Sequence, residues 1–241
     1  ITAINDAPVV IGDGTESATT INEDTPGAGQ TVNTLFAGQY SDAADNQIPN
    51  GGASSPGAFS GVAVSSNGSS GATGQWQYFN GAIWVDIGTV SDAAAKLFSN
   101  TTLLRFNPAT DFNGPAPALT VHLIDNSLGF GIVDGQVVNA SVTGGTTAYS
   151  SGTVVLSQDV TAVNDGPLNN VPGAQTINDD GSFTLSTGHG NALSVADVDA
   201  GTLTVSLTVP HGTLTLASTA GLSFGAGEGT ADTTMPFTGT A

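Results

Sequence analysis

Short hydrophobic segments, each followed by a cluster of turn-forming residues, run along the whole chain. The segments are rich in β-branched residues, and Gly, Asn, Asp, Ser and Pro gather between them. This spacing predicts many short antiparallel strands, and therefore an all-β fold of tandem antiparallel β-sandwiches instead of a parallel α/β sheet. The predicted strands are residues 61–64, 102–106, 119–124, 153–156, 203–209 and 212–216.

A β-hairpin is predicted over residues 76–85. Asn80 and Gly81 form the favoured pair for a two-residue type I′ turn, and this turn fixes the register of the two strands. In that register, Tyr78 faces Ile83 and Trp76 faces Val85 on one side, while Phe79 and Trp84 share the other side.

One helix of about two turns is predicted over residues 91–98. Ser91 is a good N-cap, three alanines follow, and Asp92 lies in the first turn, where the helix dipole favours a negative charge.

Two sequence motifs occur twice, in the same order. Residues 1–8 (Ile-Thr-Ala-Ile-Asn-Asp-Ala-Pro) match residues 160–167 (Val-Thr-Ala-Val-Asn-Asp-Gly-Pro) at an offset of 159. Residues 20–24 (Thr-Ile-Asn-Glu-Asp) match residues 176–180 (Thr-Ile-Asn-Asp-Asp) at an offset of 156. Ordered recurrence of this kind is typical of a tandem array. We therefore predict two domains, 1–163 and 164–241, and expect the second to be truncated before its last strands.

The charge of the chain is strongly one-sided. Two Lys and Arg residues stand against 20 Asp and Glu residues, which gives a net charge of −18. This charge argues against partners such as nucleic acid or anionic membranes, and no apolar run reaches the roughly 18 residues that membrane insertion needs. Cysteine is absent, which excludes disulfides and Cys-based zinc sites. Asp outnumbers Glu by 17 to 3, and short carboxylates in loops suit hard cations such as Ca²⁺, although composition alone is equally consistent with an acidic, solubilising surface.

The junction motif at residues 160–167 resembles the linker of bacterial cadherin-like, Ig-like tandem repeats. Further motifs of the long repeat variant occur at 41–46, 74–78 and 103–114, and the segment 196–201 matches the shorter variant. Such repeats build giant secreted adhesins, many of them exported by type I secretion. The resemblance implies a calcium-rigidified extender repeat, located extracellularly or on the bacterial cell surface, with a role in cell adhesion and biofilm formation. Its partners would be neighbouring repeats of the same polypeptide and a cell-surface glycan or protein.

The strand topology implied by this resemblance places acidic residues at two junctions. The interdomain set is Glu23, Asp24, Asp111, Asn164, Asp165, Asp197 and Asp199, and the N-terminal set is Asn5, Asp6, Asp42, Asp45 and Asp125. Six carboxylates in the interdomain set would repel one another unless cations lie between them. Ca²⁺ takes 6–8 oxygen ligands, which carboxylates and an Asn amide supply. A turn-capping role is an equal alternative for Asp111 and Asp125, and is the preferred one for Asp13, Asp86, Asp92, Asp134 and Asp232.

Other chemistry is sparse. His122, His189 and His211 are isolated in sequence, and no nucleophile motif accompanies them. We therefore predict that the chain is not an enzyme, with no catalytic residues, and that His122 is a packed or surface residue of a strand. The alternative function is a carbohydrate-binding β-sandwich module of a secreted protein, with Trp84 as the possible glycan contact.

Overall fold

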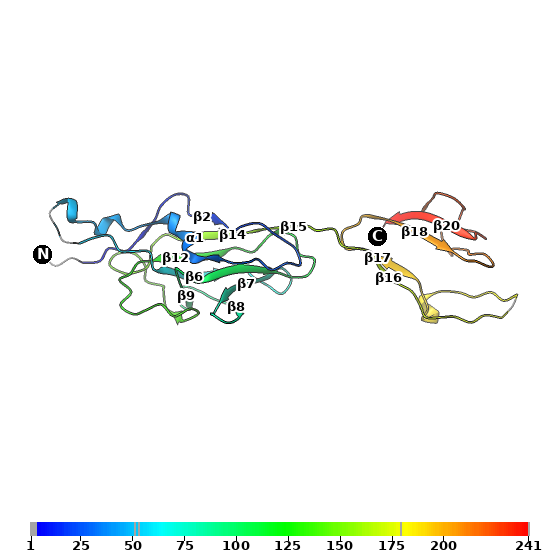
Figure 1. Ribbon diagram of the computed structural model, residues 1–241, viewed down its shortest axis with the longest axis horizontal. Coiled ribbons are helices and arrows are strands. Elements are labelled where there is room, and N and C mark those ends of the chain that lie inside the picture. The colour runs from blue at the N-terminus through cyan, green and yellow to red at the C-terminus, as the bar shows by residue number, and fades with distance from the viewer. Residues whose placement is uncertain (1–3, 51, 53, 179, 241) are drawn as a thin grey trace. The chain divides into compact units, whose positions relative to one another are not determined.

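The computed structural model describes residues 4–50, 52, 54–178 and 180–240 (Figure 1). The chain divides into two compact units, Ile1–Val163 and Asn164–Ala241. Residues 1–3, which begin the motif at 1–8, lie outside the described part. So does residue 179, in the motif at 176–180.

The described residues of unit 1 form two larger and two smaller sheets. The six-stranded sheet has the order β13 (Val137–Val138), β9 (Ala95–Ser99), β6 (Gly61–Asn67), β12 (Leu119–Ile124), β14 (Val154–Ser157) and β2 (Thr15–Ser17). The four-stranded sheet has the order β4 (Gln30–Thr31), β10 (Leu103–Pro108), β7 (Gly74–Phe79) and β8 (Trp84–Asp86). The smaller sheets have the orders β11 (Gly114–Pro115), β15 (Asp159–Thr161), β3 (Ile21–Asn22), and β1 (Val9–Val10), β5 (Tyr40–Ser41). The predicted all-β fold is confirmed.

The two larger sheets of unit 1 share one hydrophobic core. Side chains from β6, β9, β12 and β14 meet side chains from β7 and β10 in a single buried cluster. At its centre, Trp76 lies edge-on to Phe106 with ring centroids 5.4 Å apart, and its indole Nε1 donates to the Pro117 carbonyl at 2.6 Å. Most strand pairs are antiparallel, as predicted, but β2 pairs with β14 and β3 pairs with β15 in parallel. The cadherin-like sandwich topology stays a prediction.

The helix predicted over residues 91–98 is wrong. Residues Ala95–Ser99 form β9, which is hydrogen-bonded between β13 and β6. The helix preference of the three alanines is a weak local effect, and pairing on both edges of the strand overrides it. The only α-helix among the described residues is α1 (Val32–Phe36), capped by the Thr31 hydroxyl, which accepts from Thr34 N at 3.1 Å. No helix in the described part of the chain is long and apolar enough to span a membrane.

The predicted hairpin exists, but its register is wrong by two residues. Phe79 pairs with Trp84, so residues 80–83 form a four-residue loop instead of a two-residue turn. The Asn80 side chain explains this loop, since its Oδ1 accepts from the N–H groups of Ala82 and Ile83 at 3.0 and 2.9 Å. As a result Ile83 is 63% exposed, and Ile87 takes the buried position opposite Trp76.

Unit 2 contains two small antiparallel sheets. In one, β16 (Leu168–Asn170) pairs with β17 (Ser194–Ala196). In the other, β20 (Thr234–Thr240) lies between β18 (Thr202–Thr208) and β19 (Ser223–Phe224). The strand predicted at 203–209 corresponds to β18, but residues 212–216 contribute only an isolated bridge between Leu214 and Asp232. The strand predicted at 119–124 coincides with β12, and the other predicted strands agree with β6, β10 and β14, with ends that differ by at most three residues.

Candidate metal centre

Three buried carboxylates gather at one end of unit 1. Asp42 and Asp45 follow β5, and Asp45 ends the short 3₁₀ helix Ala43–Asp45, whereas Asp125 directly follows β12. Their side chains are only 4%, 6% and 0% exposed. Carboxylates are rarely this buried unless they are paired or coordinate a metal, because burial removes their hydration.

The N-terminal segment of the chain contacts this group directly. The Asp6 N–H donates to Asp45 Oδ1 at 2.8 Å, and Asn5 Nδ2 donates to Asp125 Oδ2 at 3.3 Å. The Gly57 N–H donates to Asp42 Oδ2 at 2.6 Å. All five residues of the predicted N-terminal set are therefore brought together within unit 1.

Asp42 is the member of this group whose charge is least well compensated by the protein. Burial raises the pKa of Asp42, and the carboxylates of Asp45, Asp125 and Asp6 raise it further, against the lowering effect of the Gly57 N–H. Burial also raises the pKa of the Tyr40 phenol, and the carboxylates of Asp42, Asp125 and Asp45 raise it further. Asp42 Oδ1 is buried and has no hydrogen-bond partner among the described residues. A cation would supply what this oxygen lacks.

Lys96 and Arg105, the cationic side chains of unit 1, form no ion pair with these carboxylates. Lys96 Nζ donates to the Ile87 carbonyl at 2.5 Å, and Arg105 Nε donates to Gln77 Oε1 at 2.9 Å. Within the described residues, no Lys or Arg side chain lies within ion-pair distance of a carboxylate, and the one contact of that geometry joins His122 Nε2 and Asp92 Oδ1 at 3.4 Å. Buried oxygen donors of this kind are the ligand type that a hard cation such as Ca²⁺ prefers. The oxygens of Asp42, Asp45 and Asp125 are not among the described carboxylate groups that already lie within 4.8 Å of one another, so these three side chains would have to move closer together to bind one ion.

Neutralising Asp42 should stabilise calcium-free protein. The pKa of Asp42 is raised in the folded state. The protonated carboxyl therefore stabilises the fold at pH values below the ordinary pKa of 3.8, and this stabilisation is lost as the pH rises through the raised pKa. We therefore expect Asp42→Asn to unfold at higher urea concentration than the wild type at pH 7 without Ca²⁺. The difference should shrink toward pH 4, and with saturating Ca²⁺ it should reverse. A variant that is less stable than wild type in calcium-free buffer at pH 7 would contradict this account of the site.

Two further residues of this site were missed by sequence reasoning. Asn126 Oδ1 accepts from Ala58 N at 3.2 Å, beside Asp125. A Cβ atom on Gly57 would lie 2.5 Å from Asp42 Oδ2 and 2.9 Å from Asn126 Oδ1, so only glycine fits between them. Asn126 could have been predicted as a site residue, because it follows a predicted strand and a predicted ligand. Nothing in the sequence distinguishes Gly57 from other loop glycines.

A second acidic group lies where the chain leaves unit 1. Glu23 is 2% exposed, and its carboxylate accepts from Val163 N at 2.6 Å and from Asn113 Nδ2 at 3.0 Å. Asp24 and Asp111 are exposed, each with a φ of +57°, and Asp111 N donates to Asp24 Oδ1 at 3.1 Å. Carboxylate oxygens of these two residues lie within 4.8 Å of each other.

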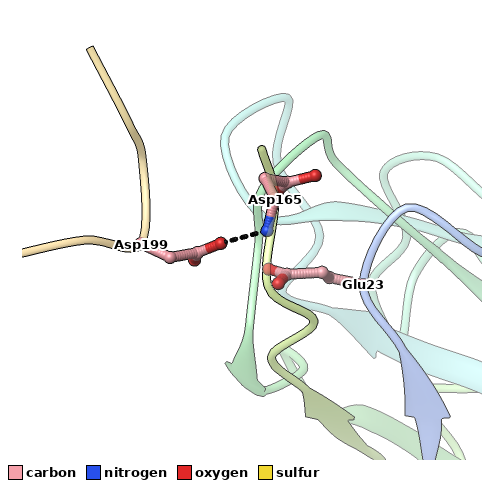
Figure 2. Close-up of side chains that lie close together, drawn as sticks. All are labelled: Glu23, Asp165 and Asp199. Atoms are coloured by element: carbon pink, nitrogen blue, oxygen red, sulfur yellow. Dashed lines mark hydrogen bonds between the residues drawn. The ribbon is translucent and has the colours of Figure 1, made fainter. Parts of the chain in front are cut away.

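Unit 2 begins with its own acidic group. Asp165 N donates to Asp199 Oδ2 at 2.6 Å (Figure 2). Asp197 Oδ1 accepts from the N–H groups of Asp199 and Ala200 at 3.0 and 2.9 Å. The predicted residues of this unit thus lie together at its start. That they share ions with Glu23, Asp24 and Asp111 stays a prediction.

The two units begin with the same local structure. The contact between Asp6 N and Asp45 in unit 1 recurs as the contact between Asp165 N and Asp199 in unit 2, and 6 and 165 differ by the repeat offset of 159. Asn5 Nδ2 and Asn164 Nδ2 donate to the carbonyl of the next residue at 3.0 and 2.8 Å. The following strands recur as well, since β1 pairs with β5 and β16 pairs with β17. The two entry segments thus share these contacts, and the tandem repeat itself stays a prediction.

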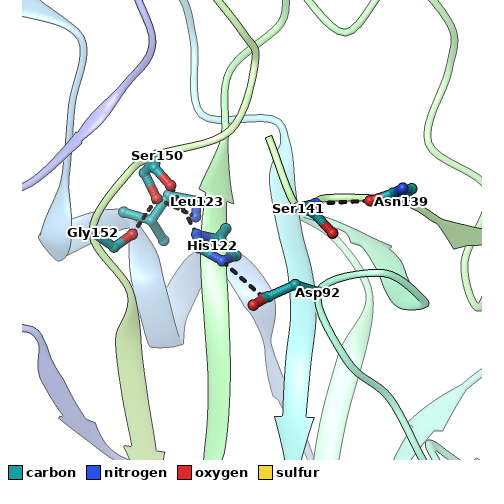
Figure 3. A network of polar contacts seen from close by, with 7 residues as sticks. All are labelled: Asp92, His122, Leu123, Asn139, Ser141, Ser150 and Gly152. Atoms are coloured by element: carbon teal, nitrogen blue, oxygen red, sulfur yellow. Dashed lines mark hydrogen bonds and ion pairs between the residues drawn. The ribbon is translucent and has the colours of Figure 1, made fainter. Parts of the chain in front are cut away.

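His122 belongs to a buried polar network of unit 1 (Figure 3). Its Nδ1 lies 2.8 Å from the Ser150 carbonyl, and its Nε2 lies 3.4 Å from Asp92 Oδ1. The Ser150 hydroxyl is used elsewhere, since it accepts from Leu123 N and donates to the Gly152 carbonyl. The residue types of a Ser-His-Asp triad therefore meet without the hydroxyl–imidazole bond that such a triad needs. That the chain is not an enzyme stays a prediction.

Trp84 is half-buried at the edge of the four-stranded sheet. The Arg105 guanidinium lies 4.1 Å from its ring centroid, and Phe79 packs against it with centroids 5.4 Å apart. A Cβ atom on Gly29 would lie 2.5 Å from its ring, which shows how closely the indole approaches that backbone. The ring is thus part of a packed cluster, and its role as a glycan contact stays a prediction.

No protein-family model matches the chain, and no match is found among curated proteins.

Proposed function

We propose that this chain is a calcium-stabilised extender repeat of a large bacterial adhesin, secreted or displayed on the cell surface. The observation that carries this proposal is the group of three buried carboxylates, Asp42, Asp45 and Asp125, with an unpartnered oxygen on Asp42. Burial raises the pKa of Asp42, and a cation beside this carboxylate would favour its charged form; Ca²⁺ is a hard cation that prefers oxygen ligands.

In this role, carboxylate oxygens of Asp42, Asp45 and Asp125 would hold the ion, and the Asn5 and Asp6 segment would close over it. The ion would neutralise the mutual repulsion of these groups and tie the N-terminal segment to the loops after β5 and β12. One of these contacts recurs at the start of unit 2, where Asp165 N donates to Asp199 Oδ2, so that repeat would hold its entry segment through the same kind of bond. A row of such repeats would act as a stiff spacer. The role in adhesion and biofilm formation rests on the resemblance of the linker and repeat motifs to cadherin-like adhesin repeats.

Terbium luminescence tests the proposed ion site. Tb³⁺ replaces Ca²⁺ at oxygen sites and emits when a nearby tyrosine is excited. Tyr40 lies two residues before Asp42, and the Asp42 carboxylate is close enough to raise the pKa of its phenol. We expect strong sensitised emission that Ca²⁺ suppresses in competition. Tyr40→Phe should lose most of it, whereas the matched variant Tyr78→Phe, in β7, should keep it. Emission unaffected by Asp42→Asn with Asp125→Asn would contradict the proposed site.

Folding coupled to extracellular calcium is a second expected result. Ligand neutralisation supplies part of the folding free energy of a metal-dependent domain, so amide exchange should be faster at nanomolar than at millimolar free Ca²⁺. We expect protection to rise most in residues 4–6, 40–46 and 124–127, and in the predicted junction segments 20–25, 108–114 and 160–200. The measurement is hydrogen–deuterium exchange. Complete protection already at nanomolar Ca²⁺ would show that folding does not depend on the ion, and would contradict the proposed function.

A further inference from the structure

Strand β18, orange in Figure 1, forms one edge of its sheet in unit 2. Its seven residues, Thr202–Thr208, pair with β20 on one side only. The other edge strands in the described part of the chain have two or three residues each. Proteins usually protect an exposed edge by keeping it short or by adding charges, proline or a bulge. β18 contains no charged residue and no proline, and its register with β20 is unbroken, so this edge is open to pairing.

Two hydrogen bonds show which backbone groups of β18 face the open side. Val209 N donates to the Thr233 carbonyl at 3.0 Å, and on the other side of β20 Gly225 N donates to the Pro236 carbonyl at 3.1 Å. Consecutive residues of a strand direct their N–H and C=O groups to opposite sides. The odd-numbered residues of β18 therefore bond to β20, and the even-numbered residues direct their groups to the open edge. These even-numbered residues are Thr202, Thr204, Ser206 and Thr208.

The sequence of β18 reads almost the same in both directions. It is Thr-Leu-Thr-Val-Ser-Leu-Thr, which is symmetric about Val205 except that one Thr is exchanged for Ser. In an antiparallel pair of two such strands, leucine would lie opposite leucine on one face, and hydroxyl side chains would lie opposite one another on the other face. The apolar residues are the half-buried ones and the hydroxyl residues are exposed, so the faces of the two strands would match.

The backbone of β18 agrees with the same symmetry axis. With Val205 opposite Val205 of a second copy, Thr204 lies opposite Ser206, and all even-numbered residues meet even-numbered residues. These are the residues whose N–H and C=O groups face the open edge. A shift by one residue would bring them opposite groups that already bond to β20, so the side chains and the backbone favour the same register.

We propose that β18 pairs with β18 of a second copy of this chain, antiparallel and with Val205 at the two-fold axis. The pairing would join two three-stranded sheets into one through about eight backbone hydrogen bonds, two for each even-numbered pair. A second copy is the partner that the near-symmetric sequence fits, since a two-fold interface must be complementary to itself. The inference goes beyond the proposed function and does not rest on it, because β18 contains no carboxylate.

Disulfide cross-linking reads the register directly, because the natural chain contains no cysteine. In the proposed pair, Val205 is a non-hydrogen-bonded position with Cα atoms about 4.5 Å apart, which suits a disulfide. We expect Val205→Cys to oxidise to a covalent dimer at least ~10-fold faster than the matched variant Leu203→Cys, whose two copies would lie about 13 Å apart. A mixture of Leu203→Cys and Leu207→Cys should cross-link as fast as Val205→Cys.

Sedimentation velocity of the unmodified chain measures the association itself. From about 10 μM to about 1 mM protein in millimolar Ca²⁺, we expect a monomer–dimer equilibrium with a Kd on the order of 100 μM, typical of a small, transient interface. Ser206→Pro removes one N–H from the open edge, where proline is tolerated, and should weaken the dimer at least ~10-fold. Ser206→Ala keeps this N–H and should leave the Kd unchanged.

Three outcomes would overturn the proposal. They are a chain that stays monomeric at every concentration, equal dimerisation of Ser206→Pro and Ser206→Ala, and equal cross-linking rates for cysteine at 203 and at 205. If hydrogen exchange shows that the even-numbered amides of β18 are protected in a monomer, another segment of the chain occupies the edge, and the proposal also fails. None of these results concerns the response to calcium, which tests the proposed function separately.

Discussion

Removal of calcium is expected to lower the midpoint of thermal unfolding by several degrees. An ion that binds only the folded state stabilises it by about 2.7 kcal/mol at a concentration 100 times its Kd. For a domain of the size of unit 1, this corresponds to a shift of roughly 5–10 °C. The comparison is a thermal unfolding curve in millimolar Ca²⁺ against one in EGTA, read by circular dichroism at constant ionic strength.

Two controls assign this effect to the buried carboxylates. Mg²⁺ at the same concentration should stabilise less, because it demands near-ideal octahedral geometry and gives up its water reluctantly. The triple variant Asp42→Asn, Asp45→Asn, Asp125→Asn should respond to Ca²⁺ much less than the wild type. If the triple variant keeps the full response, then the calcium effect arises at other residues.

Ile87→Ala is expected to destabilise unit 1 strongly, whereas Ile83→Ala should have little effect. Ile87 is fully buried, and its N–H donates to the Trp76 carbonyl at 2.9 Å. Truncation of a fully buried isoleucine costs about 2–5 kcal/mol through lost burial and the remaining cavity. Ile83 is 63% exposed in the 80–83 loop, so the same truncation there should change the free energy of unfolding by less than about 0.5 kcal/mol.

This pair of variants decides between two hairpin registers. A type I′ turn at Asn80 and Gly81 would place Ile83 on the core side opposite Tyr78, whereas the observed four-residue loop leaves it in solvent. Urea unfolding monitored by tryptophan fluorescence measures both variants on the same scale. Equal destabilisation by the two substitutions would favour the two-residue turn.

Sequence patterns predicted the strands of unit 1 well because short apolar segments lie between turn-forming residues. Burial alternates along β10, where Leu104 and Phe106 face the core, whereas β12 buries four consecutive residues, Val121–Ile124. The same reasoning failed at residues 91–98, because three alanines carry a local helix preference but no information about the two strands that flank them in space. It also failed at the hairpin, where a side-chain bond from Asn80 lengthened the turn.

The residues of the N-terminal acidic group could be named in advance because they lie in the loops that follow predicted strands. What the sequence could not show was how deeply they are buried. Asp125 is fully buried. Its carboxylate accepts from the Asn5 amide, which is far away in the chain, and from the N–H and the hydroxyl of Ser127, two residues later. The Oδ1 of Asp42, which has no hydrogen-bond partner among the described residues, is also buried by packing. No residue pattern marks it.

A crystal structure of the chain grown in millimolar CaCl₂, with anomalous data, tests the central claim most directly. The account predicts an anomalous peak bonded at about 2.3–2.6 Å to carboxylate oxygens of Asp42, Asp45 and Asp125, with Asp42 Oδ1 among its ligands. The absence of a peak there, with Asp42 Oδ1 instead hydrogen-bonded to a water molecule or protonated, would contradict it.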